Sequence, residues 1–226
     1  MNLLIDKFSR VHSYLRISVT DRCNLRCSYC MPSCGIDWKE HSSVLTYEEI
    51  TRLATLFVNL GIKKIRITGG EPIVRKNIEK LILNLSLIPG LETLAMTTNG
   101  VLLKSKAHLL KKSGLNALNI SLDTLQRERF EQITLKDNFN DVIEGVYSAL
   151  EAGFNPIKLN VVIMADINND EIIDFVHFVK DKPINIRFIE YMPFKDNGWN
   201  YAKLFSFRDM QNMIQRHYNL IPIKNG

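Results

Sequence analysis

The chain has 226 residues, 46% hydrophobic and 23% charged, which is ordinary for a globular protein and enough for one domain with a substantial core. No apolar run is long enough to cross a membrane, and charge interrupts the first residues too early for a signal peptide, so we expect a cytoplasmic protein. The net charge of +5 suits an anionic ligand, but no dense Lys/Arg block with interleaved aromatic residues predicts nucleic-acid binding.

Strand and helix patterns alternate from the first strand onward. Strands are predicted at residues 15–20, 64–68, 93–97, 117–122, 157–163 and 185–191. Helices are predicted at residues 47–60, 77–87, 103–112, 141–152, 169–180 and 207–217. Thr46 and Glu49 have the spacing of a capping box at the start of the first helix, and Gly61 follows its end.

Six successive βα units predict an α/β fold with a parallel sheet and right-handed crossovers. Six units are too few for the closed eight-stranded barrel, so an incomplete (β/α)6 three-quarter barrel or a doubly wound sheet remains. We find no linker or low-complexity segment, and we expect residues 1–226 to form a single domain.

The predicted strands alternate between polar and apolar residues. Strands of parallel sheets are usually apolar on both faces because both faces are buried. Here one face would carry Arg16, Ser18, Thr20, Arg66, Thr68, Thr97, Asn99, Asn119, Ser121, Asp123, Lys158 and Asn160. A packed interior does not tolerate so many unpaired polar groups, so we favour a polar cavity that holds a charged ligand over a face covered by water or another chain.

Three cysteines, Cys23, Cys27 and Cys30, lie in a C-x3-C-x2-C spacing in the long loop after the first strand. This is the carboxyl end of a parallel strand, where α/β folds build their sites. Three thiolates can hold three irons of a [4Fe-4S] cluster and leave the fourth iron free to bind a small molecule.

A fourth cysteine, Cys34, allows other interpretations of the same loop. Four thiolates could bind a structural zinc ion, although zinc sites usually contain two separated C-x2-C pairs. Unconnected thiols are a further alternative, and a disulfide framework is disfavoured in a long chain without a secretory signal.

The second predicted strand is followed by Gly69-Gly70-Glu71-Pro72. Two glycines allow close backbone approach to a ligand, and Glu71 can accept a hydrogen bond from an amine. Taken alone, this motif also fits an ordinary turn. Its position one strand away from the cysteine loop favours the ligand-binding interpretation.

These features resemble the radical S-adenosylmethionine (SAM) superfamily, and in particular its GTP 3′,8-cyclase family, lyases of molybdenum-cofactor biosynthesis. The residues that carry the resemblance lie at 15–24, 30–32, 65–72, 97–100, 119–123, 158–162 and 186–192, in order over nearly the whole chain.

The resemblance implies a mechanism in which Cys23, Cys27 and Cys30 bind the cluster and its open iron binds SAM. Reductive cleavage of SAM then gives a 5′-deoxyadenosyl radical, which removes the C3′ hydrogen of GTP so that C3′ attacks C8. The cofactors carry this chemistry, and no residue is expected to act as an acid or base. The resemblance also implies an external electron donor, a downstream cyclic pyranopterin monophosphate synthase and a homodimer.

The resemblance further assigns residues to each ligand. Those expected at SAM are Tyr29, Gly69, Gly70, Glu71, Ser121 and Met192, and those expected at GTP are Arg16, Arg66, Thr97 and Lys158. The strand alternation places the last four on the polar face independently. Three cations on one face suit a triphosphate, and the alternative for each is a salt bridge to a neighbouring carboxylate.

One departure from the family concerns its C-terminal region, which carries a second three-cysteine cluster site. This sequence has no cysteine after Cys34 and ends at Gly226. We therefore expect one cluster, bound SAM, weak GTP binding and impaired cyclase turnover, with Cys34 a free loop thiol. The alternatives are another radical SAM enzyme, such as a peptide-modifying one, and a zinc-binding module without catalysis.

Overall fold

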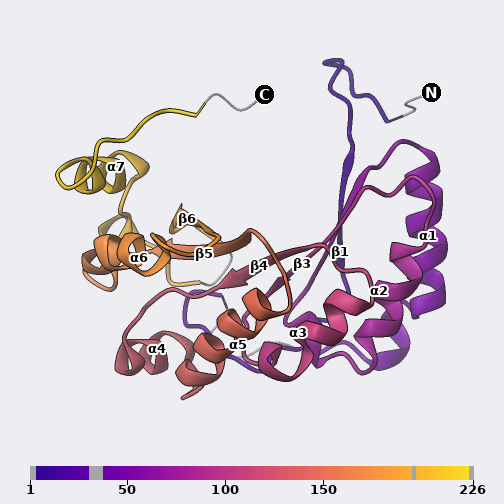
Figure 1. Ribbon diagram of the computed structural model, residues 1–226, viewed down its shortest axis with the longest axis horizontal. Coiled ribbons are helices and arrows are strands. Elements are labelled where there is room, and N and C mark those ends of the chain that lie inside the picture. The colour runs from indigo at the N-terminus through magenta and orange to yellow at the C-terminus, as the bar shows by residue number, and fades with distance from the viewer. Residues whose placement is uncertain (1–3, 31–37, 195–196, 224–226) are drawn as a thin grey trace.

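A computed structural model of the chain describes residues 4–30, 38–194 and 197–223 (Figure 1). Its strands are β1 (Tyr14–Ser18), β2 (Lys64–Thr68), β3 (Thr93–Thr98), β4 (Ala117–Ser121), β5 (Ile157–Ile163) and β6 (Ile184–Glu190). They form one parallel sheet in the order β1-β2-β3-β4-β5-β6. The strand order never reverses, as it would in a doubly wound sheet, and no described pairing joins β1 to β6. The unclosed (β/α)6 barrel is therefore confirmed.

The helices follow the strands in turn. They are α1 (Tyr47–Asn59), α2 (Ile78–Ser86), α3 (Leu103–Lys112), α4 (Arg127–Thr134), α5 (Phe139–Glu151), α6 (Ile172–Val179) and α7 (Phe207–Gln215). Short 3-10 helices are η1 (His41–Ser43), η2 (Pro72–Val74), η3 (Asn169–Glu171) and η4 (Tyr201–Lys203). Helices α1 to α5 lie along one side of the sheet, whereas α7 packs near β6 and α6 (Figure 1). Among the described residues, no helix is long and apolar enough to span a membrane.

The two faces of the sheet differ in burial. Ile65 and Ile67 of β2 are fully buried in the core that the sheet forms with the helices, as are Leu118 and Ile120 of β4. The helices contribute buried residues of their own to this core, including Ile50, Leu81, Leu110 and Val146. The apolar face is therefore filled, and the alternate residues of the same strands face the opposite side.

Local signals explain most of the element boundaries. The capping box at α1 is present, because the Thr46 side chain accepts a hydrogen bond from the Glu49 N–H and the Glu49 carboxylate accepts one from the Thr46 N–H. Gly61 has a φ of 106°, which only glycine adopts readily, and α1 ends before it. The predicted helix 169–180 divides into η3 and α6, and α4 was not predicted at all.

Candidate active site

The three cysteines lie on the loop that follows β1, which we call the cluster loop (residues 19–30). This loop is held by the carboxyl end of α4. The N–H of Arg26 donates to the Thr134 carbonyl and the N–H of Ser28 donates to the Ile133 carbonyl, each at 2.9 Å. These are carbonyls that the helix leaves without partners at its end. Helix α4 therefore fixes the backbone from which Cys27 projects.

The cysteine thiols are close enough for the charge of one to shift the pKa of another. Burial raises the pKa of Cys23, Cys27 and Cys30, and the charges of the other two cysteines raise that of Cys27 further. For Cys30 the Cys23 charge is the second cause. Such thiols hold their protons until a cation arrives, and a bound metal reverses this by stabilising the thiolates. The donor set therefore fits a group that binds several thiolates at once.

Among residues 4–30, 38–194 and 197–223, no three His, Cys, Asp or Glu side chains are gathered as a site for a single metal ion. Cys34 lies outside the described residues, and its predicted role as a free thiol stays a prediction.

The glycines after β2 are required by the cluster loop. A Cβ at Gly70 would lie 2.3 Å from the Arg22 carbonyl oxygen, and one at Gly69 would lie 2.4 Å from the Thr20 carbonyl oxygen. The Gly70 N–H donates to the Thr20 carbonyl at 2.7 Å, and the Glu71 N–H to the Arg22 carbonyl at 2.8 Å. The structure therefore shows a close approach of the glycines to the backbone of the cluster loop beside Cys23, and their approach to a ligand stays a prediction.

A cavity of about 820 Å³ opens on the polar face of the sheet. Its polar lining includes Arg16, Arg66, Thr68, Thr97, Asn119 and Asn160, all of which the strand alternation places on this face. Its other wall is mainly apolar and comes from β6 and α7, with residues such as Ile186, Phe188, Met210 and Ile214. Met192, which is 49% exposed, lies at this cavity as well. A cavity is thus present on the predicted polar face, with one polar wall and one apolar wall, and the charged ligand expected there stays a prediction.

Arg16, Arg66 and Arg187 line this cavity, whereas Lys158 on β5 is in register with Asn119 but is not among the lining residues. Arg66 is 9% exposed and donates to the Thr97 hydroxyl at 3.4 Å. Burial lowers the pKa of Arg66, and the charges of Arg16 and Arg187 lower it further. The pKa of Lys158 is lowered by burial and then by Arg187, Lys64 and Arg66.

Within the described part of the chain, none of Arg16, Arg66, Lys158 and Arg187 forms an ion pair with a carboxylate. The alternative of salt bridges to neighbouring carboxylates is not what the structure shows for these residues. Like charges without counterions favour an anionic ligand.

The sequence profile of the radical SAM superfamily matches residues 17–179, which is most of the chain. The chain belongs to the radical SAM superfamily. Superfamily membership implies a [4Fe-4S] cluster and SAM as cofactors. SuiB of Streptococcus suis, solved with SAM bound, has the same fold with a TM-score of 0.73 and 19% identity over 91% of this chain and 47% of its own.

Two curated relatives extend the comparison over nearly the whole chain. The mitochondrial GTP 3′,8-cyclase of Arabidopsis thaliana is 51% identical over 96% of this chain and 56% of its own length. The GTP 3′,8-cyclase of Listeria welshimeri is 51% identical over 91% of this chain and 62% of its own length. The chain thus spans roughly half to two thirds of the length of these relatives.

Glu71, which is expected at SAM, is buried in this radical SAM domain. It is 1% exposed, and its oxygens accept hydrogen bonds from the Thr98 hydroxyl at 2.8 Å, the Asn99 N–H at 2.6 Å and the Ile73 N–H at 3.1 Å. Burial raises the pKa of Glu71, and these three bonds oppose that rise. The carboxylate is directed into the protein, so its geometry is that of a support for the loop.

Asn99 links this support to the cluster loop. Its side-chain amide donates to the Asn24 side chain at 2.7 Å and to the Cys23 sulfur at 3.6 Å. The N–H of Leu25 donates to the same sulfur at 3.4 Å. Hydrogen bonds of this kind orient a metal ligand and tune its charge. The sequence placed Asn99 on the polar face but gave no sign of a contact with a cysteine.

The Tyr29 side chain is held by the buried carboxylate of Asp123. Its hydroxyl donates to the Asp123 carboxylate at 2.5 Å, and the Val162 N–H donates to the same carboxylate at 2.8 Å. Burial raises the pKa of Asp123 to about 6, and the bonds from Tyr29 and Val162 oppose that rise. Tyr29, Cys27, Ser121 and Asp123 also line one small cavity between the cluster loop and the end of β4. The structure thereby brings the expected SAM residues Tyr29 and Ser121 together.

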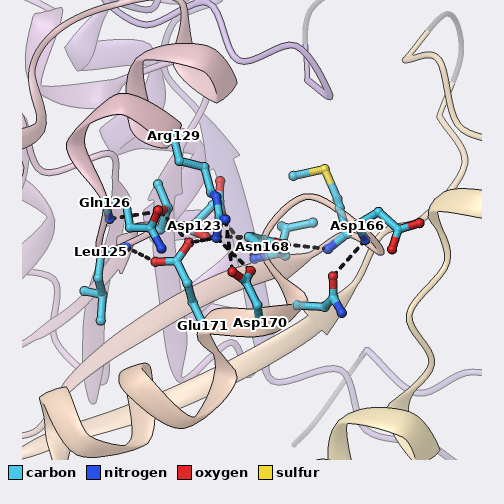
Figure 2. A network of polar contacts seen from close by, with 12 residues as sticks. Asp123, Leu125, Gln126, Arg129, Asp166, Asn168, Asp170 and Glu171 are labelled. Atoms are coloured by element: carbon cyan, nitrogen blue, oxygen red, sulfur yellow. Dashed lines mark hydrogen bonds and ion pairs between the residues drawn. The ribbon is translucent and has the colours of Figure 1, made fainter.

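A further polar network lies at the ends of β4 and β5 (Figure 2). Buried Glu171 accepts hydrogen bonds from the Thr124 hydroxyl and the Leu125 N–H, both at 2.6 Å, and pairs with Arg129 of α4. Arg129 also binds Asp170 at 2.7 Å. This network holds α4 through Arg129, and the end of α4 in turn holds the cluster loop, so the network supports the cysteines indirectly. No motif in the sequence predicts it.

Proposed function

We propose that this chain carries the cluster, SAM and GTP sites of a GTP 3′,8-cyclase. The observation that carries the proposal is the cavity whose cations lack carboxylate partners among the described residues, on the same sheet as the cluster loop. Identity of 51% to proteins named GTP 3′,8-cyclase supports the same substrate. An enzyme whose cluster site and anion site share one sheet can hold SAM and a nucleoside triphosphate within reach of each other.

The cofactor end of the site is formed by residues from three loops and from the end of β4. The cluster would be held by Cys23, Cys27 and Cys30. A reduced cluster would supply the electron that cleaves SAM, and this cleavage would start the removal of a substrate hydrogen. We assign contacts with SAM to Tyr29, Gly69, Gly70, Ser121 and Met192. Glu71 holds the end of β3 and the Gly-Gly segment in place, which makes it a positioning residue instead of a direct ligand.

The substrate end is formed by the strands. We assign Arg16, Arg66 and Lys158 to the phosphates of GTP, with Thr97 beside them, because guanidinium and ammonium groups bind phosphate oxygens by charge-assisted hydrogen bonds. Arg187 lines the cavity, and its charge lowers the pKa of both Arg66 and Lys158. We therefore add Arg187 to the residues assigned to the phosphates. Holding the phosphates there directs the ribose toward the cluster loop.

The external electron donor, the downstream synthase that takes the product, the homodimer and the single-domain organisation of residues 1–226 remain predictions. The reaction itself requires the first of these, because the cluster must be reduced before SAM is cleaved. The synthase would act on a cyclised nucleotide after its release from this site.

The test is anaerobic reconstitution with iron and sulfide, followed by iron counting and by paramagnetic resonance of the reduced protein with and without SAM. We expect about four irons per chain and a signal that SAM shifts, as for one site-differentiated cluster. Cys27→Ala should lose the cluster, whereas Cys34→Ser should keep it. One zinc ion per chain and no effect of SAM would instead establish the zinc-binding module.

The substrate is tested by 5′-deoxyadenosine formation with GTP, with ATP and with no nucleotide. We expect GTP to increase the yield and ATP not to do so. A yield that no nucleotide changes, from protein with a normal cluster, would contradict the GTP assignment and favour another radical SAM substrate, such as a peptide.

A further inference from the structure

The amide of Asn119 is buried without a partner. Asn119 lies on β4, is 1% exposed and lines the large cavity. Among the residues that the structure describes, neither its Nδ2 nor its Oδ1 has a hydrogen-bond partner. Buried polar groups are almost always hydrogen-bonded, so a buried amide with both ends free calls for a ligand. An apolar residue would fill this strand position better if packing were its only role.

The neighbours of Asn119 locate it between the two ends of the site. Across the sheet it is in register with Thr97 on one side and Lys158 on the other, both assigned to the substrate. Along β4 it stands two residues before Ser121, a distance of roughly 6.6 Å, on the same face. Ser121 shares a cavity with Tyr29 of the cluster loop. Asn119 therefore lies between the residues assigned to GTP and Ser121, which is assigned to SAM.

A second unpaired group lies on the adjacent strand. Asn160 of β5 lines the same cavity, is in register with Ser121, and has a buried Oδ1 without a partner in the described part of the chain. Asn119 therefore offers one donor and one acceptor, and Asn160 adds an acceptor beside them. A phosphate has only acceptors for this purpose and would leave both Oδ1 atoms unsatisfied. Two neighbouring hydroxyls, each able to donate and accept, satisfy all three atoms.

We propose that Asn119, with Asn160 beside it, binds the vicinal ribose hydroxyls of the nucleotide substrate and so selects ribonucleotides over 2′-deoxyribonucleotides. The inference rests on the proposed function, because it takes a nucleoside triphosphate as the occupant of the cavity. Loss of one hydroxyl leaves a buried amide atom unpaired in the complex, which is a strong means of discrimination. Asn119 thereby becomes a specificity-determining residue.

The test measures the binding of GTP and 2′-deoxy-GTP to the anaerobically reconstituted protein with SAM, by equilibrium dialysis. We expect the wild-type protein to bind GTP roughly tenfold more tightly than 2′-deoxy-GTP, and Asn119→Leu to bind the two about equally. Asn84→Ala, an exposed change on α2, is the matched control and should keep the preference. Thermal unfolding is a second measurement: an Asn119 without protein partners predicts that Asn119→Leu is as stable as the wild type or more so.

The outcomes separate the inference from the proposed function. No GTP binding by the wild type would overturn both. GTP binding without a preference over the deoxynucleotide, or a preference that Asn119→Leu keeps, would overturn the inference alone. Equal losses for both nucleotides would place Asn119 at a group they share, and a loss of SAM affinity alone would place it at the ribose of the cofactor; each contradicts the assignment. If Asn119→Leu fails to fold, the smaller Asn119→Ala takes its place in the binding measurements, with the same outcomes.

Discussion

Glu71 and Glu171, which come from different loops, share two kinds of hydrogen bond. Each accepts from a threonine hydroxyl at the carboxyl end of a strand, Glu71 from Thr98 at 2.8 Å and Glu171 from Thr124 at 2.6 Å. Each also accepts, at 2.6 Å, from the N–H of the residue that follows the threonine. The threonine hydroxyl in turn accepts from the N–H two residues further on.

In this shared arrangement, each of two adjacent loops of the site is held by one buried glutamate. Glu71 supports the loop after β3, in which the Asn99 side chain donates to the Cys23 sulfur. Glu171 supports the loop after β4, which leads to α4. Each carboxylate accepts from three donor groups, which offsets the cost of burying it. The rigid backbone around the cysteines therefore depends on acids that do not face the ligands.

Replacing Glu71 by Gln tests this support. The amide turns one oxygen into a donor, which then faces the N–H or hydroxyl groups that Glu71 now accepts from, and we expect a loss of roughly 1–3 kcal/mol in the free energy of unfolding. Because Asn99 connects this site to the Cys23 sulfur, the iron content after reconstitution should fall too. Urea unfolding and iron counting measure the two effects. Glu128→Gln, an exposed change on α4, should alter neither.

Asp123 gives the apoprotein a pH dependence of defined sign. Burial raises its pKa from 3.8 to about 6 in the folded state, so the folded protein binds the proton more tightly than the unfolded chain does. The stabilisation by protonated Asp123 is complete below pH 3.8 and is lost as the pH rises through about 6. Asp123→Asn removes this dependence. Relative to that variant, the wild-type apoprotein should lose about 3 kcal/mol of unfolding free energy across this range.

Urea unfolding of both apoproteins at several pH values measures this difference. The comparison with Asp123→Asn removes the effects of all other titrating groups, which the two proteins share. A difference in unfolding free energy that is constant from pH 4 to pH 7 would show that burial does not raise the pKa of Asp123.

Gly70→Ala tests the contact between the Gly-Gly segment and the cluster loop. The added Cβ would lie 2.3 Å from the Arg22 carbonyl oxygen, a backbone atom that can move only with the cluster loop. We expect a loss of roughly 1–3 kcal/mol in stability and a marked fall in bound iron. Gly90→Ala is the control, since φ there is +91° and its nearest contact is an ordinary 3.5 Å from Val58. That variant should lose stability through backbone strain but keep its iron, and equal iron loss in both would contradict the local explanation.

The polar face and the cavity can be predicted from the sequence because strand side chains alternate with period two. Arg66 and Thr97 lie on different strands, but their positions in the alternation suffice to place them on one face. The helices with an apolar stripe and a cap, such as α1, can be predicted for the same reason, since the signal is local.

Helix α4 and the burial of Glu71 could not be predicted because their causes are not local. The α4 segment buries only Phe130, Ile133 and Thr134, and its N-cap residue makes no side-chain hydrogen bond. Its stabilising contacts come from Arg129 and from the cluster loop, which meet it only in the folded chain. Likewise, Gly-Gly-Glu-Pro has the composition of an exposed turn, and two of the three donors to Glu71 come from Thr98 and Asn99, at the end of β3.

Arg187 is the site residue that the sequence did not single out, and its substitution tests the substrate end of the site. Arg187→Met keeps much of the apolar stem but removes a charge that lowers the pKa of both Arg66 and Lys158. We expect GTP affinity to fall roughly tenfold or more, since a hydrogen-bonded charge pair contributes about 1.5–3 kcal/mol. The affinity for SAM, whose expected contacts lie around the cluster loop, should not change. Lys180→Met, an exposed change at the end of α6, controls for the loss of net charge. Equal effects of the two substitutions on GTP binding would reduce the role of Arg187 to a long-range charge effect, whereas a loss confined to Arg187→Met places its guanidinium at the phosphates.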